Sequence, residues 1–417
     1  MLNLEQAQAA ILAAVRRGSR IETVPLVQAL GRYTATALNA RTDHPAFDNS
    51  AMDGYAMRTV DLAAHAFRLP LAGEARCGAA PGTLASATVM RIFTGAPLPA
   101  GADTVVMQED VQVENGVVTL PRNVVPDQNL RRRGEDFRLG DVLYAPGRRL
   151  SAWDLALLAT AGVAEVAVYA RPRALVVATG DELVAPGAPL KPGQIYESNR
   201  LATLSLLAQL GADVTDGGTV RDDPVALRAL LQRACDFADR TEARAAGQGW
   251  PDCGFDFIVT SGGASVGDYD VVKQVFAEIG EIKFWKVRIK PGKPIAFGHV
   301  GERTHFFALP GNPVSSLVTF KLFVEPAVYA WHHAHAPALT LRAQAANGFR
   351  RRPGRTEFLR ARLYNHDGHL LVDALKGQGS HMLGPLRETN VLIRVEAESA
   401  GFEAGSPVTV IPLGAEF

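Results

Sequence analysis

The stretch TSGGASVGDYDVV, residues 260–272, combines glycines and hydroxyl side chains in a way that suits a phosphate-binding turn. Gly262 and Gly263 lack a Cβ atom, so their backbone N–H groups can approach a phosphate closely. Ser261 and Ser265 add hydroxyl donors, and the helix expected next would add partial positive charge at its N-terminus. The stretch lacks the Gly-Lys-Ser/Thr ending of a P-loop and the GxGxxG pattern of dinucleotide-binding loops. A tight turn between a strand and a helix is the alternative.

Asp270 stands at or near the start of the helix that follows this turn. A carboxylate there is either a helix cap or, beside a bound phosphate, a ligand of Mg²⁺, because the two anions would otherwise repel each other. Other acids stand beside glycines or at expected loop and helix starts: Asp53, Asp136, Glu182 and Asp222. The chain shows no plausible Ser-His-Asp or Cys-His arrangement. The pattern favours phosphate-ester or phosphoanhydride chemistry with a divalent metal.

A second turn, LPGNPVSS at residues 309–316, resembles the same device. Pro310 and Pro313 restrict the backbone, and Gly311 opens it for close approach. Two serines fall in the first turn of the helix expected to follow. A plain strand-to-helix turn is again the alternative.

Positive charge is concentrated in WKVRIKPGKP, residues 285–294. Alternation along an extended segment places Lys286, Arg288 and Lys290 on one side. These side chains either bind an anion or form a solvated strand face.

Strand and helix patterns alternate from residue 172 to residue 330. Runs such as RALVVATG and FDFIVTSGG indicate buried strands, and SNRLATLSLLAQLG and YDVVKQVFAEIG indicate helices. This alternation predicts a parallel sheet covered on both faces. Ligands of such sheets bind beyond the carboxyl ends of the strands, where ATGDEL (178–183) and the two turns above all fall. Three separate loops at one edge predict a common site.

Shorter elements are expected elsewhere. Apolar spacing predicts helices over residues 3–17 and 25–31, and over 151–163 with Ser151 as its N-cap. Between about 45 and 150, short apolar runs alternate with Gly/Pro turns, which indicates a β domain inserted in a helical one.

Two polar stretches are expected at the surface. Residues 239–254 look like a polar insertion. The stretch HHAHAPA, with His332, His333 and His335, is expected to be a solvated linker rather than a metal tract. The chain after residue 338 returns to short strands and turns, which indicates a small β domain.

The composition bounds the class of protein. The 417 residues are enough for roughly two to four domains. Lys+Arg and Asp+Glu are both 43, so no basic footprint favours nucleic acid. Three cysteines without CxxC spacing favour neither disulfides nor a cysteine zinc site, and a reducing cytoplasm fits. Neither a signal peptide nor a membrane span is expected.

Taken together, these motifs resemble one family closely: molybdopterin molybdenumtransferases of the MoeA type, whose animal relative is the E domain of gephyrin. The combination runs in family order from residue 49 to residue 383 and is specific, although no single motif is. The matching stretches are NSAMDGYAMR, IFTGAPLPAGADTVVMQED, RRRGEDF, ATGDEL, RDDP, SGGASVGDYD, FWKVRIKPGKP, LPGNPVSS and GQGSHML.

The resemblance implies a multidomain α/β-plus-β fold and an elongated homodimer. The expected domains are a mostly helical dimerisation domain (1–46 and 141–171), an inserted β domain (47–140), a doubly wound molybdopterin-binding α/β domain (172–330) and a C-terminal β domain (338–417).

The implied reaction belongs to molybdenum cofactor biosynthesis. Adenylylated molybdopterin and molybdate are the implied substrates: the pterin–AMP anhydride is cleaved with the help of Mg²⁺, AMP leaves, and molybdenum enters the dithiolene. The resemblance points to the molybdopterin adenylyltransferase and to maturation proteins of molybdoenzymes as further partners.

The resemblance also implies roles for individual acids and their neighbours. The positions expected to be catalytic are Asp53, Thr94, Asp136, Glu182, Asp222 and Asp270. The first three lie on the β-domain side and would act across the dimer cleft. The last three would line the sheet-edge pocket, with Glu182 and Asp270 near the metal and the phosphates. By local sequence alone, Asp53 in SAMDGYA would be an ordinary Asp-Gly turn.

The substrate-binding positions implied by the family are Ser261, Gly262, Gly263, Ser265, Lys286, Lys290, Pro310, Gly311, Pro313, Arg360 and Ser380. The two lysines would attract molybdate or phosphate, and the prolines would shape a pterin-side loop. Departures are small: Ala178 stands where relatives often have serine, and the 239–254 insertion is unusually long.

Two other functions compete with this interpretation. The adenylyltransferase of the same pathway shares the α/β domain, but the 170 residues before that domain argue against it. A scaffold that binds a receptor peptide, as gephyrin does, is the second alternative. The full acidic set and the absence of the scaffold's linker and tails argue against that role.

Overall fold

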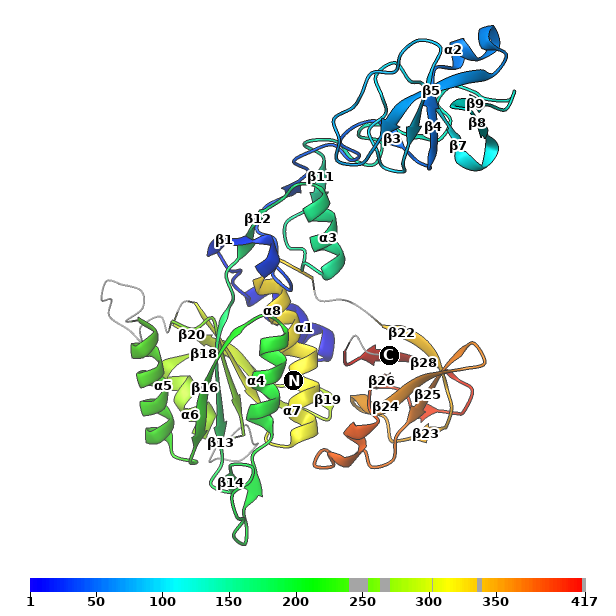
Figure 1. The fold of residues 1–417 in the computed structure, drawn as a ribbon. Coiled ribbons are helices and arrows are strands. Elements are labelled where there is room, and N and C mark those ends of the chain that lie inside the picture. Colours follow the sequence, from blue (N-terminus) through cyan, green and yellow to red (C-terminus); the bar gives the residue numbers. More distant parts are fainter. Residues whose placement is uncertain (240–253, 263–270, 302, 336–339, 415–417) are drawn as a thin grey trace. The chain divides into compact units, whose positions relative to one another are not determined.

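The computed structural model describes residues 1–239, 254–262, 271–301, 303–335 and 340–414. They form two compact units. The larger unit comprises residues 1–21 and 169–417, and the smaller unit comprises residues 22–168. Figure 1 shows the fold of both, coloured along the sequence. No helix among the described residues is long and apolar enough to cross a membrane.

A six-stranded sheet forms the centre of the larger unit, in the order β16-β13-β17-β21-β20-β18. Its first four strands are parallel, as predicted: β16 (Asp213–Val220), β13 (Arg173–Thr179), β17 (Phe257–Ser261) and β21 (Thr304–Leu309). The last two, β20 (Pro294–Val300) and β18 (Gly280–Lys286), are antiparallel, which the prediction of a parallel sheet missed. Val300 pairs with Thr304, and so short a connection cannot hold the crossover that a parallel pair requires.

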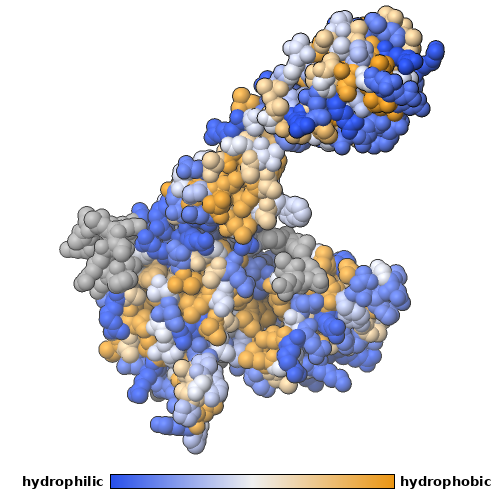
Figure 2. All heavy atoms as spheres, in the orientation of Figure 1, coloured by the Kyte–Doolittle hydropathy of each residue, from blue (hydrophilic) through white to orange (hydrophobic). Residues whose placement is uncertain are grey.

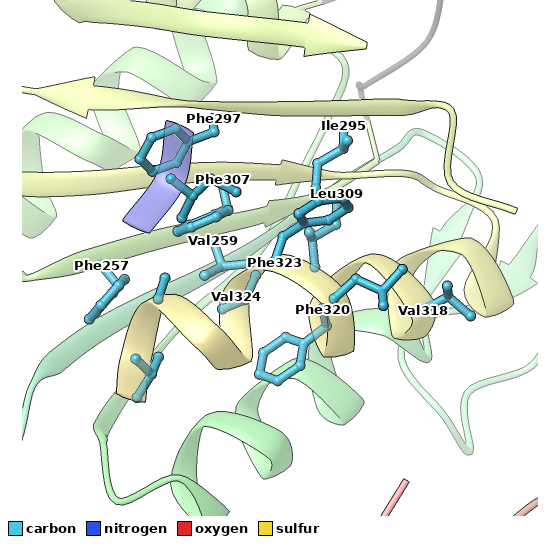
Figure 3. Close-up of a cluster of buried hydrophobic side chains, with 14 of the residues drawn as sticks. Phe257, Val259, Ile295, Phe297, Phe307, Leu309, Val318, Phe320, Phe323 and Val324 are labelled. Carbon is cyan, nitrogen blue, oxygen red and sulfur yellow. The ribbon is translucent and has the colours of Figure 1, made fainter. Parts of the chain in front are cut away.

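Alternate residues of β13 point to opposite faces of this sheet, and each face has its own core. Ala174 and Val176 belong to the cluster under α1, α4, α7 and α8, whereas Leu175 and Val177 belong to the cluster under α5 and α6. Figure 3 shows the first core, where phenylalanines of the sheet face Phe320 and Phe323. The domain is therefore doubly wound, as predicted.

The helices around the sheet lie close to their predicted places. They are α1 (Leu4–Ala14), α4 (Asn199–Gln209), α5 (Pro224–Asp239), α6 (Val271–Ile279), α7 (Pro313–Thr319) and α8 (Glu325–Trp331). A π-helical turn at Phe320–Val324 separates α7 from α8. Two short parallel strands, β14 (Leu183–Val184) and β15 (Ile195–Tyr196), project after β13.

The C-terminal β domain is a closed ring. Its strands follow the order β24-β25-β22-β28-β26, and β26 pairs again with β24, so the ring leaves no free edge. The strands are β22 (Leu341–Ala345), β24 (Thr356–His366), β25 (His369–Ala374), β26 (Val391–Val395) and β28 (Pro407–Pro412), with a small pair β23 (Phe349–Arg350) and β27 (Gly401–Phe402). The short strand β19 (Ile289–Lys290) joins β24 and ties this domain to the α/β domain.

The smaller unit contains a second six-stranded sheet, in the order β7-β4-β6-β5-β9-β8. Its strands are β4 (Gly54–Met57), β5 (Arg68–Ala75), β6 (Val89–Ile92), β7 (Thr104–Met107), β8 (Gln112–Glu114) and β9 (Val117–Thr119), beside the short helix α2 (Thr59–Leu62). Two short antiparallel pairs form separate sheets: β2 (Leu38–Asn39) with β11 (Val142–Tyr144), and β3 (Asn49–Ser50) with β10 (Leu130–Arg131). The β-rich texture predicted for this part of the chain is confirmed.

Helix α3 (Ala152–Thr160) begins as predicted at Ser151, whose hydroxyl accepts from the N–H of Asp154 in a capping box. The predicted helix over 25–31 was wrong. That segment contains the end of β1 (Ile21–Pro25), which pairs with β12 (Glu165–Tyr169), followed by one 3₁₀ turn at Leu26–Gln28.

Two of the three histidines expected in a solvated linker are instead packed, while His335 is exposed as predicted. His332 is buried, and the ring of His333 stacks on Tyr169, with Nε2 2.9 Å from the carbonyl oxygen of Gly18. Gly18 itself lies against the indole of Trp331, where an added Cβ would come within 2.6 Å of the ring. The end of α8 thus anchors the segment that follows α1.

Candidate active site

A cavity of about 640 Å³ opens at the carboxyl ends of the parallel strands β13, β17 and β21. Its lining residues at or after these strand ends are Thr179, Glu182, Leu183, Ser261, Gly262, Pro310, Gly311, Asn312, Pro313 and Ser315. Asp222, which follows β16, lines it as well, and Ile195, Tyr196, Glu197, Ser198, Asn199, Pro294 and His381 complete it. The predicted meeting of three loops at one sheet edge is therefore found in the structure.

Strand register brings the loops together. Ala178 is level with Ser261, and Ser261 is level with Leu309, so all three loops leave the sheet at the same height. Gly262 has φ +86°, and an added Cβ would come within 2.2 Å of the Thr179 carbonyl oxygen. Glycine is needed here because two backbones pass closely, a reason separate from phosphate approach.

Two of the predicted acids, Glu182 and Asp222, line this cavity. Burial raises the pKa of Asp222 above its ordinary value, and the negative charges of Glu182 and Asp181 raise it further. A hydrogen bond from the backbone of Asp181 acts in the opposite direction. Carboxylates that repel one another in this way are suited to share a cation.

Sequence reasoning missed the polar run at the start of α4. Asn199 donates from Nδ2 to the carbonyl oxygen of Gly311 at 2.7 Å, which links this segment to the Pro310–Pro313 turn. The buried Glu197 accepts from the N–H of Arg200 at 2.6 Å, and Ser198, the residue at the N-cap, makes no side-chain cap hydrogen bond. The signal was present as four polar or aromatic residues, YESN, which lead into the first turn of a helix.

The predicted lysines lie outside this cavity. Val287 and Ile289 are buried, while Lys286, Arg288 and Lys290 are exposed, so the expected alternation is found. Lys290 is paired with the buried carboxylate of Glu357, at 2.8 Å.

Arg360 and Ser380 meet at a loop of the C-terminal domain that also carries His381 into the cavity. The Arg360 side chain is only 1% exposed and donates to the carbonyl oxygens of Gly377, Gly379 and Met382. Burial lowers the pKa of its guanidinium. The carbonyl oxygen of Ser380 accepts from the N–H of Val314, at the start of α7, at 3.1 Å.

In the smaller unit, Asp53 and Thr94 are in direct contact. The N–H and the hydroxyl of Thr94 both donate to Asp53 Oδ1, at 2.7 and 2.9 Å. These hydrogen bonds, helped by the charge of Arg91, hold the pKa of Asp53 below its ordinary value. Asp136 is exposed on the same unit, and its N–H donates to the carbonyl oxygen of His44.

Part of the predicted site lies outside the described residues. This applies to Gly263, Ser265 and Asp270, and to residues 240–253 of the predicted insertion.

Family comparisons cover almost the whole chain. Residues 2–162 match the MoeA N-terminal region (domain I and II), residues 175–330 a probable molybdopterin binding domain, and residues 342–413 the MoeA C-terminal region (domain IV).

Individual relatives agree. A molybdopterin molybdenumtransferase of Haemophilus influenzae is 38% identical, over 99% of this chain and 98% of its own length. The corresponding protein of Nostoc is 35% identical, over 94% and 88%. A crystal structure of the molybdopterin biosynthesis MoeA protein from Pyrococcus horikoshii matches with a TM-score of 0.80 and 30% identity, covering 100% of both chains.

The fold confirms the multidomain α/β-plus-β class predicted from the sequence, and the curated relatives are transferases. The chain belongs to the molybdopterin molybdenumtransferase family, the MoeA enzymes of molybdenum cofactor biosynthesis.

Proposed function

We propose that this molybdenumtransferase acts on adenylylated molybdopterin, cleaving the pterin–AMP anhydride and releasing AMP as molybdate is incorporated. The observation that carries the proposal is the cavity itself. It places the acids Glu182 and Asp222 beside the glycine turn at Gly262, at the edge of the sheet where α/β domains bind ligands.

The donor set of this cavity fits Mg²⁺. Mg²⁺ takes oxygen ligands and is usually held by one or two carboxylates, with water and substrate phosphates completing the shell. The described residues supply such a pair in Glu182 and Asp222, and they contain no group of three or more His, Cys, Asp or Glu arranged to hold a metal. Asp270 remains a proposed third acid. The bound cation would neutralise charge on the phosphates.

The chain's own groups would bind and orient the ligand. Ser261 offers a hydroxyl at the end of β17, while Pro310, Gly311 and Pro313 shape the opposite wall. Lys286 and Lys290 remain proposed as an approach surface for molybdate or phosphate, since both side chains are exposed beside the α/β domain. Asp53, with its lowered pKa, is ionised at neutral pH.

We also propose a homodimer whose two protomers complete each site. The smaller unit exposes large apolar side chains on two elements that pack together, the 3₁₀ turn with the residues after it and α3. Val27 is 86% exposed, Leu30 59% and Trp153 87%, and Figure 2 shows hydrophobic residues gathered over α3. Exposed apolar surface of this kind marks an interface. The four-domain division, a cytoplasmic location and the pathway partners remain proposals that rest on the family resemblance.

The metal requirement tests the proposed function. Single-turnover AMP release from adenylylated molybdopterin should stop in EDTA and return with Mg²⁺, because the acids would otherwise repel the phosphates. Asp222→Asn should raise the Mg²⁺ concentration needed for half-maximal release. Asp223→Asn is the matched control, since Asp223 caps the N-terminus of α5 through the N–H of Val225 and asparagine also caps well. Full turnover in chelator would remove the metal from the proposal.

A further inference from the structure

The described lining of the cavity has an unusual balance of charge for a site that takes a phosphate ligand. It includes three acids, Glu182, Glu197 and Asp222, and a single basic side chain, His381. The adjoining residues 263–270 contain no lysine or arginine in their sequence. Phosphate oxygens need donors, and His381 is the one basic side chain among the described lining residues.

The buried guanidinium of Arg360 fixes the loop that carries His381. Arg360 directs its guanidinium to three backbone carbonyl oxygens, those of Gly377, Gly379 and Met382, which lie on both sides of the histidine. Withdrawing a guanidinium from water is costly unless its N–H groups are satisfied. The structure satisfies them by fixing this loop, so the side chain has no described contact with the cavity.

Further hydrogen bonds fix the loop at its other attachments. Gln378 accepts from the N–H of Arg360 at 3.0 Å and donates to the carbonyl oxygens of Arg360 and Leu375, at 2.9 and 2.7 Å. Ser380 is bound through its carbonyl oxygen to Val314, whose helix begins at the cavity wall. Hydrogen bonds thus join the loop to the C-terminal β domain through Gln378 and to the α/β domain through Ser380.

We propose that His381 donates a hydrogen bond to a phosphate oxygen of the bound ligand, and that Arg360 is a positioning residue that presents it. The inference rests on the proposed function, because the phosphate-bearing ligand is adenylylated molybdopterin. A donor held in place before the ligand arrives contributes more to binding than a mobile one, since its ordering is completed during folding.

The first experiment measures the dissociation constant of adenylylated molybdopterin for the full-length protein. His381→Ala should weaken binding by about 10–100-fold, the effect of losing one charge-assisted hydrogen bond. The melting temperature should stay unchanged because this side chain is exposed. His369→Ala is the matched control: it removes an exposed histidine of the same domain that does not line the cavity. Equal affinity of wild type and His381→Ala overturns the proposal.

The second experiment separates positioning from direct binding by Arg360. Arg360→Lys keeps the charge but cannot reach three carbonyl oxygens at once. It should weaken binding as His381→Ala does, and the double variant should be within about 3-fold of the weaker single variant, because both changes remove one contact. If the loss of affinity in the double variant equals the product of the losses in the two single variants, Arg360 acts separately from His381, and the positioning role is overturned. If Arg360→Lys fails to fold, Gln378→Ala replaces it in the double-mutant cycle with His381→Ala, because Gln378 also holds this loop through hydrogen bonds.

The two proposals fail in different ways. Normal AMP release by the wild type, together with unchanged affinity in His381→Ala, overturns this inference and leaves the proposed function standing. A wild type that neither binds nor cleaves adenylylated molybdopterin overturns both.

Discussion

At the scale of single residues, the contact between Asp53 and Thr94 gives the sharpest test of the predicted catalytic set. Asparagine at position 53 can still accept both hydrogen bonds through its Oδ1, so Asp53→Asn removes the charge and keeps the contact. If the carboxylate is catalytic, Asp53→Asn should slow AMP release by about 10²–10⁴-fold, while the affinity for adenylylated molybdopterin and the melting temperature stay unchanged. Single-turnover kinetics beside calorimetry measures all three.

The same unit supplies the control for that variant. Asp103 likewise contacts a threonine: it accepts from the N–H of Thr59 at Oδ1 and from the hydroxyl of Thr59 at Oδ2, at 2.8 and 2.7 Å, where Asp53 uses one oxygen for both bonds. Asp103→Asn should leave AMP release unchanged. A wild-type rate for Asp53→Asn as well would return Asp53 to the role of a turn residue and weaken the roles proposed for Thr94 and Asp136.

At the scale of elements, the start of α3 depends on the ionised Asp154. Burial opposes that charge, but hydrogen bonds from Arg148, Tyr144 and Ser151 prevail and hold the pKa of Asp154 well below its ordinary 3.8. Since the folded-state pKa is the lower one, this stabilisation is fully present above about pH 4 and is lost as the pH falls through the folded-state value. Asp154→Asn should cost about 1–3 kcal/mol at neutral pH, and melting curves should show the difference from wild type shrinking in acid. A difference independent of pH would contradict this account.

At the scale of the whole molecule, the exposed apolar side chains Val27, Leu30 and Trp153 predict self-association. Trp153→Asp should give a monomer by light scattering, because a charge in the centre of an apolar interface is desolvated without a partner. AMP release should fall with it if sites are shared between protomers. Val60→Asp, which places the same charge on a side chain that is 77% exposed on α2, should leave the dimer intact. A fully active monomer at working concentration would contradict the shared site.

Local periodicity was enough to predict the doubly wound domain and the Ser151 cap. The continuous apolar run in RALVVATG and a serine before an apolar helical pattern depend only on neighbours in the chain. The helix predicted over 25–31 failed because strand pairing with β12 and one 3₁₀ turn prevailed over its apolar spacing. The antiparallel edge of the sheet was likewise decided by the short connection between β20 and β21.

The sequence alone determined which loops would meet at one sheet edge, because glycines, prolines, acids and hydroxyl groups cluster in short motifs at strand ends. Only the tertiary structure decided how these residues act together. Strand register placed Ser261 level with Leu309, and a loop 199 residues after Glu182 brought His381 to the same cavity. The tertiary structure also placed Arg360 against that loop, where its buried guanidinium donates hydrogen bonds to three carbonyl oxygens. Contacts between segments so distant in sequence arise from packing, which local residue patterns do not encode.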